Sequence, residues 1–180
     1  HRVLQFLAGF RQHNHMPRSL KNADLINLPN HDEFAYVRDN LGYGDKCLVL
    51  PFGLSETRLR MFATVGRPAQ VRLAANTVAF VGQWSARKGA RDWGAIVWKV
   101  REKIADTKFL FLGTGSSPDN VLRDLDLPSY PWLRIVPVFR SEQLPALLTG
   151  AAVGAFPSYI EGFPFAVLEM LAAGLPVVAY

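Results

Sequence analysis

Short runs of consecutive apolar residues recur through the second half of the sequence. They cover residues 78–81, 109–112, 135–138, 153–156 and 177–180. The runs are continuous rather than alternating, as expected of strands that are buried on both faces. Amphipathic segments separate them, and the clearest carries an apolar helical face made of Trp93, Ile96, Val97, Val100 and Ile104. This order of strands and helices predicts an α/β fold, a parallel sheet with helices on both faces. Pro137 indicates that the third run is an edge strand or a bulge.

The first part of the chain has fewer sequence patterns that predict strands or helices. Residues 24–28 and 47–50 predict short strands, and between them Asn30 and Glu33 have the spacing of a helix start. An apolar stripe within residues 1–13 predicts a helix that packs on other structure or lies on a membrane surface. Residues 54–76 are charged and show no period. The predicted organisation is therefore a first domain over 1–55, a linker over 56–76 and the sheet domain over 77–180.

Composition narrows the choice of partners. The chain has 180 residues, 49% of them apolar, and its 20 basic and 15 acidic residues give a net charge of +5. This charge favours anionic partners, but no long basic block or aromatic-basic repeat indicates nucleic-acid binding. The single cysteine, Cys47, fits a reducing compartment. The sequence shows neither a signal peptide nor an apolar run of transmembrane length. Because it ends on a strand-like apolar run, we expect a fragment of a longer protein.

The loop after the first predicted strand of the sheet domain carries two adjacent cations. Arg87 and Lys88 lie between Gly82 and Gly89, and their charges suit a diphosphate, although a solvated basic turn has the same pattern. The loop after the second strand, 113–118, has a proline where a dinucleotide fingerprint needs its third glycine. We therefore reject nicotinamide binding. No cluster of metal ligands and no motif of a hydrolase or phosphate-loop enzyme is present.

The stretch from Pro157 to Glu169 organises the domain. It follows the apolar run 153–156, and its two carboxylates, Glu161 and Glu169, are eight residues apart. Gly162 gives backbone freedom between them, and Pro164 suits the first turn of a helix. A helix start attracts phosphate, so the two carboxylates could hold hydroxyl-bearing parts of one ligand on either side of its phosphates. A helix cap and a solvated helix face remain the simpler alternatives.

Four stretches in this order resemble glycosyltransferases of the GT-B type, specifically family 4. They are 80–82 with 87–89, 109–115, 156–163 and 168–178, and Glu161 and Glu169 match the family's pair of glutamates separated by seven residues. Residues 20–54 resemble the end of the family's first lobe more faintly. The resemblance implies two Rossmann-like lobes, with this chain carrying an incomplete donor-binding lobe and the end of the acceptor lobe.

The resemblance also implies roles for individual residues. Glu161 would be the catalytic residue at the donor sugar, Lys88 would neutralise the diphosphate and Glu169 would contact the ribose. Arg87 and the backbone N–H groups of Gly162 and Phe163 would complete the donor site. The implied reaction transfers a sugar, with retention of configuration, from a UDP-, GDP- or ADP-sugar to a glycan, a lipid-linked acceptor or a small molecule. It would use no metal and no cofactor.

Two departures from the family pattern qualify this expectation. Gln83 stands where the family commonly has an arginine, so Arg87 would have to supply the second cation. Most of the acceptor lobe is missing, so we expect residues 1–180 to bind a donor weakly and not to turn over. The expected location is cytoplasmic, with peripheral contact to the inner face of a membrane left open. A sugar-nucleotide epimerase of the same fold and a non-catalytic nucleotide-sugar-binding module remain alternatives.

Overall fold

The computed structural model describes residues 15–180, and the apolar stripe predicted in residues 1–13 lies outside them. The chain divides into two compact units. The first comprises the residues up to Gly53 together with Ile160–Phe163, and the second comprises Leu54–Tyr159 and Pro164–Tyr180. A four-residue loop segment is therefore grouped with a different unit from the residues on either side of it.

A parallel pair of short strands forms the centre of the first unit. β1 (Ile26–Leu28) pairs with β2 (Cys47–Val49), and α2 (His15–Asn22) precedes them. The connection between the strands consists of α3 (His31–Tyr36), a π-helical turn η1 (Val37–Leu41) and a 3-10 turn η2 (Gly44–Lys46). Buried Ile26, Leu28 and Val37 make the core of this unit. Both strands predicted in this part of the chain are confirmed, in shorter form.

The helix between these strands begins where the sequence predicts. The side chain of Asn30 accepts a hydrogen bond from the backbone N–H of Glu33 at 2.8 Å, so Asn30 is the N-cap. Gly42 ends the helical segment with a φ of 73°, a left-handed conformation that glycine adopts without strain.

The second unit contains, within the described residues, a five-stranded sheet in the order β5-β4-β3-β6-β7. All neighbouring strands are parallel. The strands are β3 (Thr77–Val81), β4 (Lys108–Leu112), β5 (Leu133–Val136), β6 (Val153–Phe156) and β7 (Val177–Ala179). Each predicted run overlaps one strand, which confirms the parallel sheet. Pro137 lies directly after β5, an edge strand of the sheet, as the prediction for an edge position requires.

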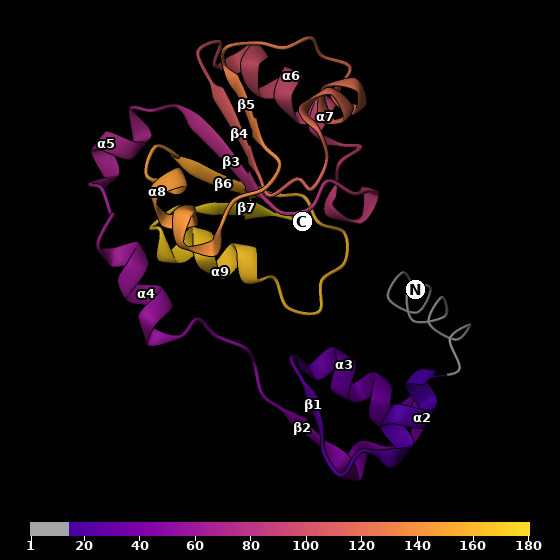
Figure 1. Ribbon diagram of the computed structural model, residues 1–180. Coiled ribbons are helices and arrows are strands. Elements are labelled where there is room, and N and C mark those ends of the chain that lie inside the picture. The colour runs from indigo at the N-terminus through magenta and orange to yellow at the C-terminus, as the bar shows by residue number, and fades with distance from the viewer. Residues whose placement is uncertain (1–14) are drawn as a thin grey trace. The chain divides into compact units, whose positions relative to one another are not determined.

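Helices cover both faces of this sheet (Figure 1). α6 (Trp93–Lys103) and α7 (Pro118–Leu125) lie on one face and contribute to a core with the side chains of Val78 and Phe80. α8 (Leu144–Leu148) and α9 (Phe165–Ala172) lie on the other, in a core with Ala79 and Val81. Alternate residues of β3 are thus buried on opposite faces, which is why its sequence is apolar without alternation.

The residues predicted as a linker carry two helices, α4 (Glu56–Ala63) and α5 (Ala69–Leu73). By its contacts this segment belongs to the second unit, which begins at Leu54. Phe62 is 1% exposed and is part of the core that α8 and α9 share with the sheet. Because Phe62 is the buried residue of α4, the helix presents too narrow an apolar stripe for its period to be recognised in the sequence.

Two helical segments start where the sequence pattern did not place them. Ser141 has the residue type of an N-cap, but Arg140 is the N-cap of the 3-10 turn η4 (Ser141–Gln143). The backbone N–H of Arg140 donates to the side chain of Gln143 at 2.8 Å, and this bond fixes the start of the turn. Helix α7 was not predicted, although Ser117 caps it and Pro118 occupies its first turn.

Candidate functional site

The strand order of the sheet changes direction between the neighbouring strands β3 and β6. β4 and β5 lie on one side of β3, and β6 and β7 lie on the other. In open parallel sheets, ligands bind beyond the carboxyl ends of the strands at such a switch point. The candidate site is therefore formed by the loop after β3, residues 82–92, and by residues 157–159, the start of the loop after β6, which belong to the same unit.

The loop after β3 is held against the sheet at its start. The N–H groups of Gly82 and Trp84 donate to the carbonyls of Leu112 and Thr114, at 2.9 and 2.7 Å, continuing the ladder beyond the strand. The indole N–H of Trp84 donates to a carboxylate oxygen of Asp124 at 3.0 Å. These bonds leave the 3-10 turn η3 (Ala86–Lys88), which carries both predicted cations, at the carboxyl edge of the sheet.

The loops after β3 and β6 are joined to each other at Arg87. Its backbone carbonyl accepts one hydrogen bond from the N–H of Tyr159, at 3.0 Å, and another from the hydroxyl of Ser158, at 3.3 Å. The phenol of Tyr159 donates to Asp92 at 2.5 Å. Desolvation and the charge of Asp92 raise the pKa of Tyr180, whose phenol lies 3.4 Å from the same carboxylate oxygen. The positions of the two loops are thus mutually fixed.

Gly89 allows the two loops to approach this closely. Its φ is 79°, and a Cβ atom placed there would lie 2.1 Å from the carbonyl oxygen of Pro157. A side chain at position 89 would therefore force the loops apart. The glycine that was noted in the sequence as a boundary of the basic pair has a steric function in the structure.

The two predicted cations differ in their surroundings. The Arg87 side chain is exposed, whereas Lys88 is partly buried and its ammonium lies 4.9 Å from the ring centre of Phe156, the last residue of β6. Lys88 is therefore held over the carboxyl end of a strand next to the switch point. Gln83, at the position where an arginine was expected, is exposed.

Glu169 lies on α9 and is paired with an arginine that the sequence did not indicate. Its Oε1 accepts hydrogen bonds from Nε and Nη2 of Arg58, at 3.0 and 2.6 Å. Arg58 comes from α4, 111 residues earlier, and no sequence pattern relates positions so far apart. The N-terminus of α9, next to the loop after β6, has Pro164 as its N-cap and no capping bond from that side chain.

The other predicted site residues, Glu161, Gly162 and Phe163, lie in the loop segment that is grouped with the first unit. There the carbonyl of Gly162 accepts a hydrogen bond from the side chain of Asn30 at 2.9 Å. The ring of Phe163 meets that of Phe52 edge to face, with centroids 5.4 Å apart. The structure thus brings Arg87 and Lys88 together with residues 157–159 of the loop after β6, and groups Glu161, Gly162 and Phe163 of the same loop with the first unit.

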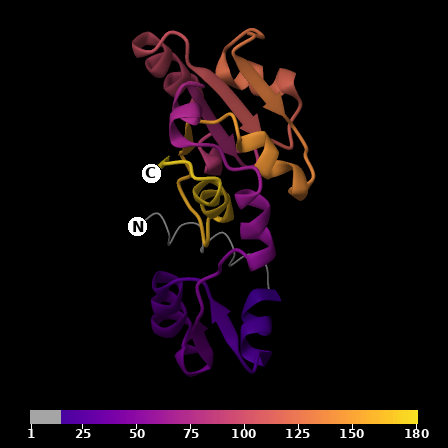
Figure 2. The ribbon, with the colours of Figure 1, turned by 90° about the vertical axis from the view of Figure 1, so that its left-hand side faces the viewer.

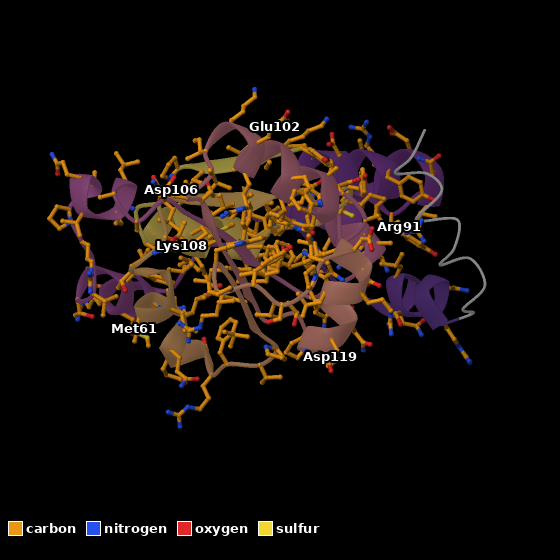
Figure 3. The ribbon with its side chains drawn as sticks, turned by 90° about the horizontal axis from the view of Figure 1, so that it is seen from above. Met61, Arg91, Glu102, Asp106, Lys108 and Asp119 are labelled. Atoms are coloured by element: carbon orange, nitrogen blue, oxygen red, sulfur yellow. The ribbon has the colours of Figure 1, made fainter. Side chains whose placement is uncertain are left out.

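A cavity of about 420 Å³ lies beside the loop after β3. Trp84, Arg91 and Asp124 are among its lining residues, and Arg91 is labelled in Figure 3. Glu102 and Asp119, by contrast, are exposed on α6 and α7 and project away from the sheet (Figure 3).

In residues 15–180, no three or more His, Cys, Asp or Glu side chains gather into a set that could hold a metal ion. Over the same residues, no helix combines the length and apolarity needed to cross a membrane.

Comparison with known proteins identifies relatives of this chain. A family model described as glycosyl transferases group 1 matches residues 75–180, more than half of the chain. A curated protein of Corynebacterium kroppenstedtii, D-inositol 3-phosphate glycosyltransferase, is 32% identical over 121 residues, which are 63% of this chain and 27% of that protein. The chain thus spans about a quarter of the length of this relative.

Solved structures show the same fold. Sucrose-phosphate synthase from Thermosynechococcus elongatus superposes with a TM-score of 0.68 at 24% identity, over 91% of this chain and 42% of that one. The pneumococcal O-GlcNAc transferase GtfA, solved with UDP and GlcNAc, gives a TM-score of 0.67 at 11% identity, over 93% of this chain and 32% of its own.

Proposed function

The chain belongs to the group 1 glycosyl transferases, of the GT-B type, and we propose that it holds the nucleotide-sugar donor site of a retaining enzyme of family 4. The observation that carries the proposal is the bond between the Tyr159 N–H and the Arg87 carbonyl. This bond fixes the loop with the two cations beside the loop after β6, at the topological switch point of a parallel sheet. The proposed ligand is a UDP-, GDP- or ADP-sugar. UDP is the first nucleotide to test, because GtfA was solved with it.

The charged groups of the site suit the leaving group of such a reaction. In sugar transfer the bond between the anomeric carbon and the diphosphate oxygen breaks with its electron pair on that oxygen. A bond to the acceptor oxygen forms, and the acceptor's hydroxyl proton passes to the departing diphosphate or to water. The diphosphate gains negative charge as it leaves, so cations stabilise the transition state more than the bound donor. Lys88 is proposed to contact the diphosphate, with Arg87 as the second cation and the N-terminal end of α9 adding its dipole.

The carboxylates are assigned to the hydroxyl groups of the donor. A carboxylate accepts hydrogen bonds and donates none, so it recognises a diol. We assign Glu169 to the ribose and Glu161 to the donor sugar, and the backbone N–H groups of Gly162 and Phe163 to the phosphates or the sugar. The resemblance of residues 156–169 to the family motif supports these roles. The proposed acceptor is a glycan, a lipid-linked sugar or a small molecule, and the proposed compartment is the cytoplasm. The site as proposed needs no metal ion.

Calorimetric titration of the chain with UDP, GDP and ADP tests this proposal. Lys88→Ala should weaken binding of the preferred nucleotide tenfold or more, because a charge-assisted hydrogen bond contributes about 1.5–3 kcal/mol. The matched control is Lys108→Ala, which removes a lysine from the first residue of β4, at the amino edge of the same sheet. Its affinity should equal that of the wild type. A chain that melts cooperatively but binds none of the three nucleotides would contradict the proposal and favour a non-catalytic module.

A further inference from the structure

Helix α4 brings an arginine to the site from outside the sheet. Ser55 caps the helix by accepting a hydrogen bond from the N–H of Arg58 at 3.2 Å, and buried Phe62 anchors its other end in the core. α4 packs against α8 and α9, and Figures 1 and 2 both show it beside α9. The Arg58 side chain reaches Glu169 on α9 and the backbone of Ser141 in η4.

All three nitrogens of the Arg58 guanidinium have acceptors. Nε and Nη2 donate to Oε1 of Glu169, and Nη1 donates to the backbone carbonyl of Ser141 at 2.7 Å. The guanidinium also lies 4.9 Å from the ring centre of Phe62. The side chains of Arg58 and Glu169 are only 13% and 19% exposed. An ion pair that is both shielded from water and held by several bonds has a defined geometry, unlike most exposed pairs.

The two oxygens of the Glu169 carboxylate have different environments. Both hydrogen bonds from Arg58 go to Oε1, and within residues 15–180 no hydrogen bond to Oε2 is found. A carboxylate has about four acceptor positions, so Oε2 can still accept from hydroxyl groups. Arg58 thus fixes the orientation of the carboxylate while leaving one oxygen available to a ligand.

We propose that Arg58 is a positioning residue for ribose recognition. It holds Oε1 of Glu169 so that Oε2 accepts hydrogen bonds from the vicinal hydroxyls of the donor's ribose. Arg58 itself does not touch the donor. This inference rests on the proposed function, because it takes Glu169 as the ribose-binding carboxylate. It adds a residue outside the four motif stretches, on a segment that the sequence indicated only as a linker.

The test compares the affinity for a nucleoside diphosphate with that for its 2′,3′-dideoxy analogue. The base is the one that wild-type protein prefers, and both affinities are measured by calorimetry. The wild type should bind the ribonucleotide about tenfold more tightly than the dideoxy analogue, as expected for a hydrogen bond to a charged group. We call this preference the affinity ratio, and Glu169→Ala should lower it to about one. Arg58→Met should lower the ratio to near that of Glu169→Ala. Arg58→Lys, which keeps the charge but not the guanidinium geometry, should give an intermediate ratio.

Arg60→Met is the matched control. Arg60 lies on the same helix and pairs with Glu56 four residues away, but the two side chains are 75% and 78% exposed. In Arg60→Met, the ratio of the affinities for the ribonucleotide and its dideoxy analogue should equal that of the wild type. A ratio preserved in a folded Arg58 variant, even one that melts at a lower temperature, would show that Arg58 only attaches α4 to α9. If Arg58→Met does not fold, the affinity ratio of Arg58→Lys is the test, and a value equal to that of the wild type would contradict the inference.

Failure of the inference can be distinguished from failure of the proposed function. A wild type that binds a nucleoside diphosphate without preferring ribose would overturn the roles of Glu169 and Arg58 and leave the donor site in place. A folded wild type that binds none of UDP, GDP and ADP would overturn the donor site, and the inference with it.

Discussion

The backbone N–H of Tyr159 donates a hydrogen bond to the backbone carbonyl of Arg87 at 3.0 Å. The two residues belong to loops that follow β3 and β6, strands that lie side by side in the sheet but are far apart in sequence. Through this bond the loop that carries Arg87 and Lys88 has a fixed position relative to the loop after β6. A site that is organised before its ligand arrives loses less entropy on binding.

Substitution of Gly89 should damage this arrangement. Gly89→Ala places a Cβ atom 2.1 Å from the carbonyl oxygen of Pro157 at a φ of 79°. We expect the free energy of unfolding to fall by about 3 kcal/mol and nucleotide affinity to fall with it, because the turn with Lys88 is displaced. Urea unfolding and calorimetry measure the two effects.

Gly115→Ala provides the control for backbone conformation. Gly115 also has a positive φ, 63°, but a Cβ atom there would have no neighbour within 4 Å. Its cost should be about 1 kcal/mol, from the left-handed conformation alone. Equal losses of stability in the two variants would show that the contact between Gly89 and Pro157 does not constrain the loops.

The hydroxyl of Tyr159 should stabilise the same pair of loops. Tyr159→Phe removes the hydrogen bond to Asp92, and the expected loss is about 1 kcal/mol in the free energy of unfolding. Tyr130→Phe is the comparison, because the Tyr130 ring stacks on Trp132 and its hydroxyl makes no hydrogen bond within residues 15–180. If chemical denaturation gives the same stability for both variants, the bond to Asp92 contributes nothing.

The buried face of α9 should determine how firmly this helix is attached. Met170 is fully buried against the sheet, and Met170→Ala should lower the free energy of unfolding by about 2–5 kcal/mol. Leu171, the next residue, is 51% exposed, so Leu171→Ala should change it by less than about 1 kcal/mol. Thermal and urea denaturation of both variants check this, and a similar cost at the two positions would contradict the assigned faces of α9.

The sheet could be predicted from the sequence because burial on both faces requires continuous apolar runs. The runs at 78–81 and 153–156 correspond to β3 and β6 closely. The helix cap at Asn30 was equally predictable, since its signal is local. The strand order was not, because pairing between β3 and β6 depends on packing that no local pattern records.

The sequence indicated where the two cations of the candidate site lie, but not the contacts that hold its elements together. Arg87 and Lys88 were expected in a loop after a strand, and the structure places them in the turn that follows β3. The bond between Arg58 and Glu169 joins residues 111 positions apart, and α4 shows one buried residue, so the segment had no period to indicate a helix. The grouping of Ile160–Phe163 with the first unit likewise has no counterpart in the sequence.

The most direct test of the proposed site is an amide NMR titration of the chain with the nucleoside diphosphate that it prefers. We expect the largest shifts in the loop 82–89, at Ser158 and Tyr159, and in the first turn of α9. Lys108 and Arg134, at the amino half of the sheet, should be unaffected. Shifts concentrated around Lys108 and Arg134, or none at saturating nucleotide in a folded sample, would contradict this expectation.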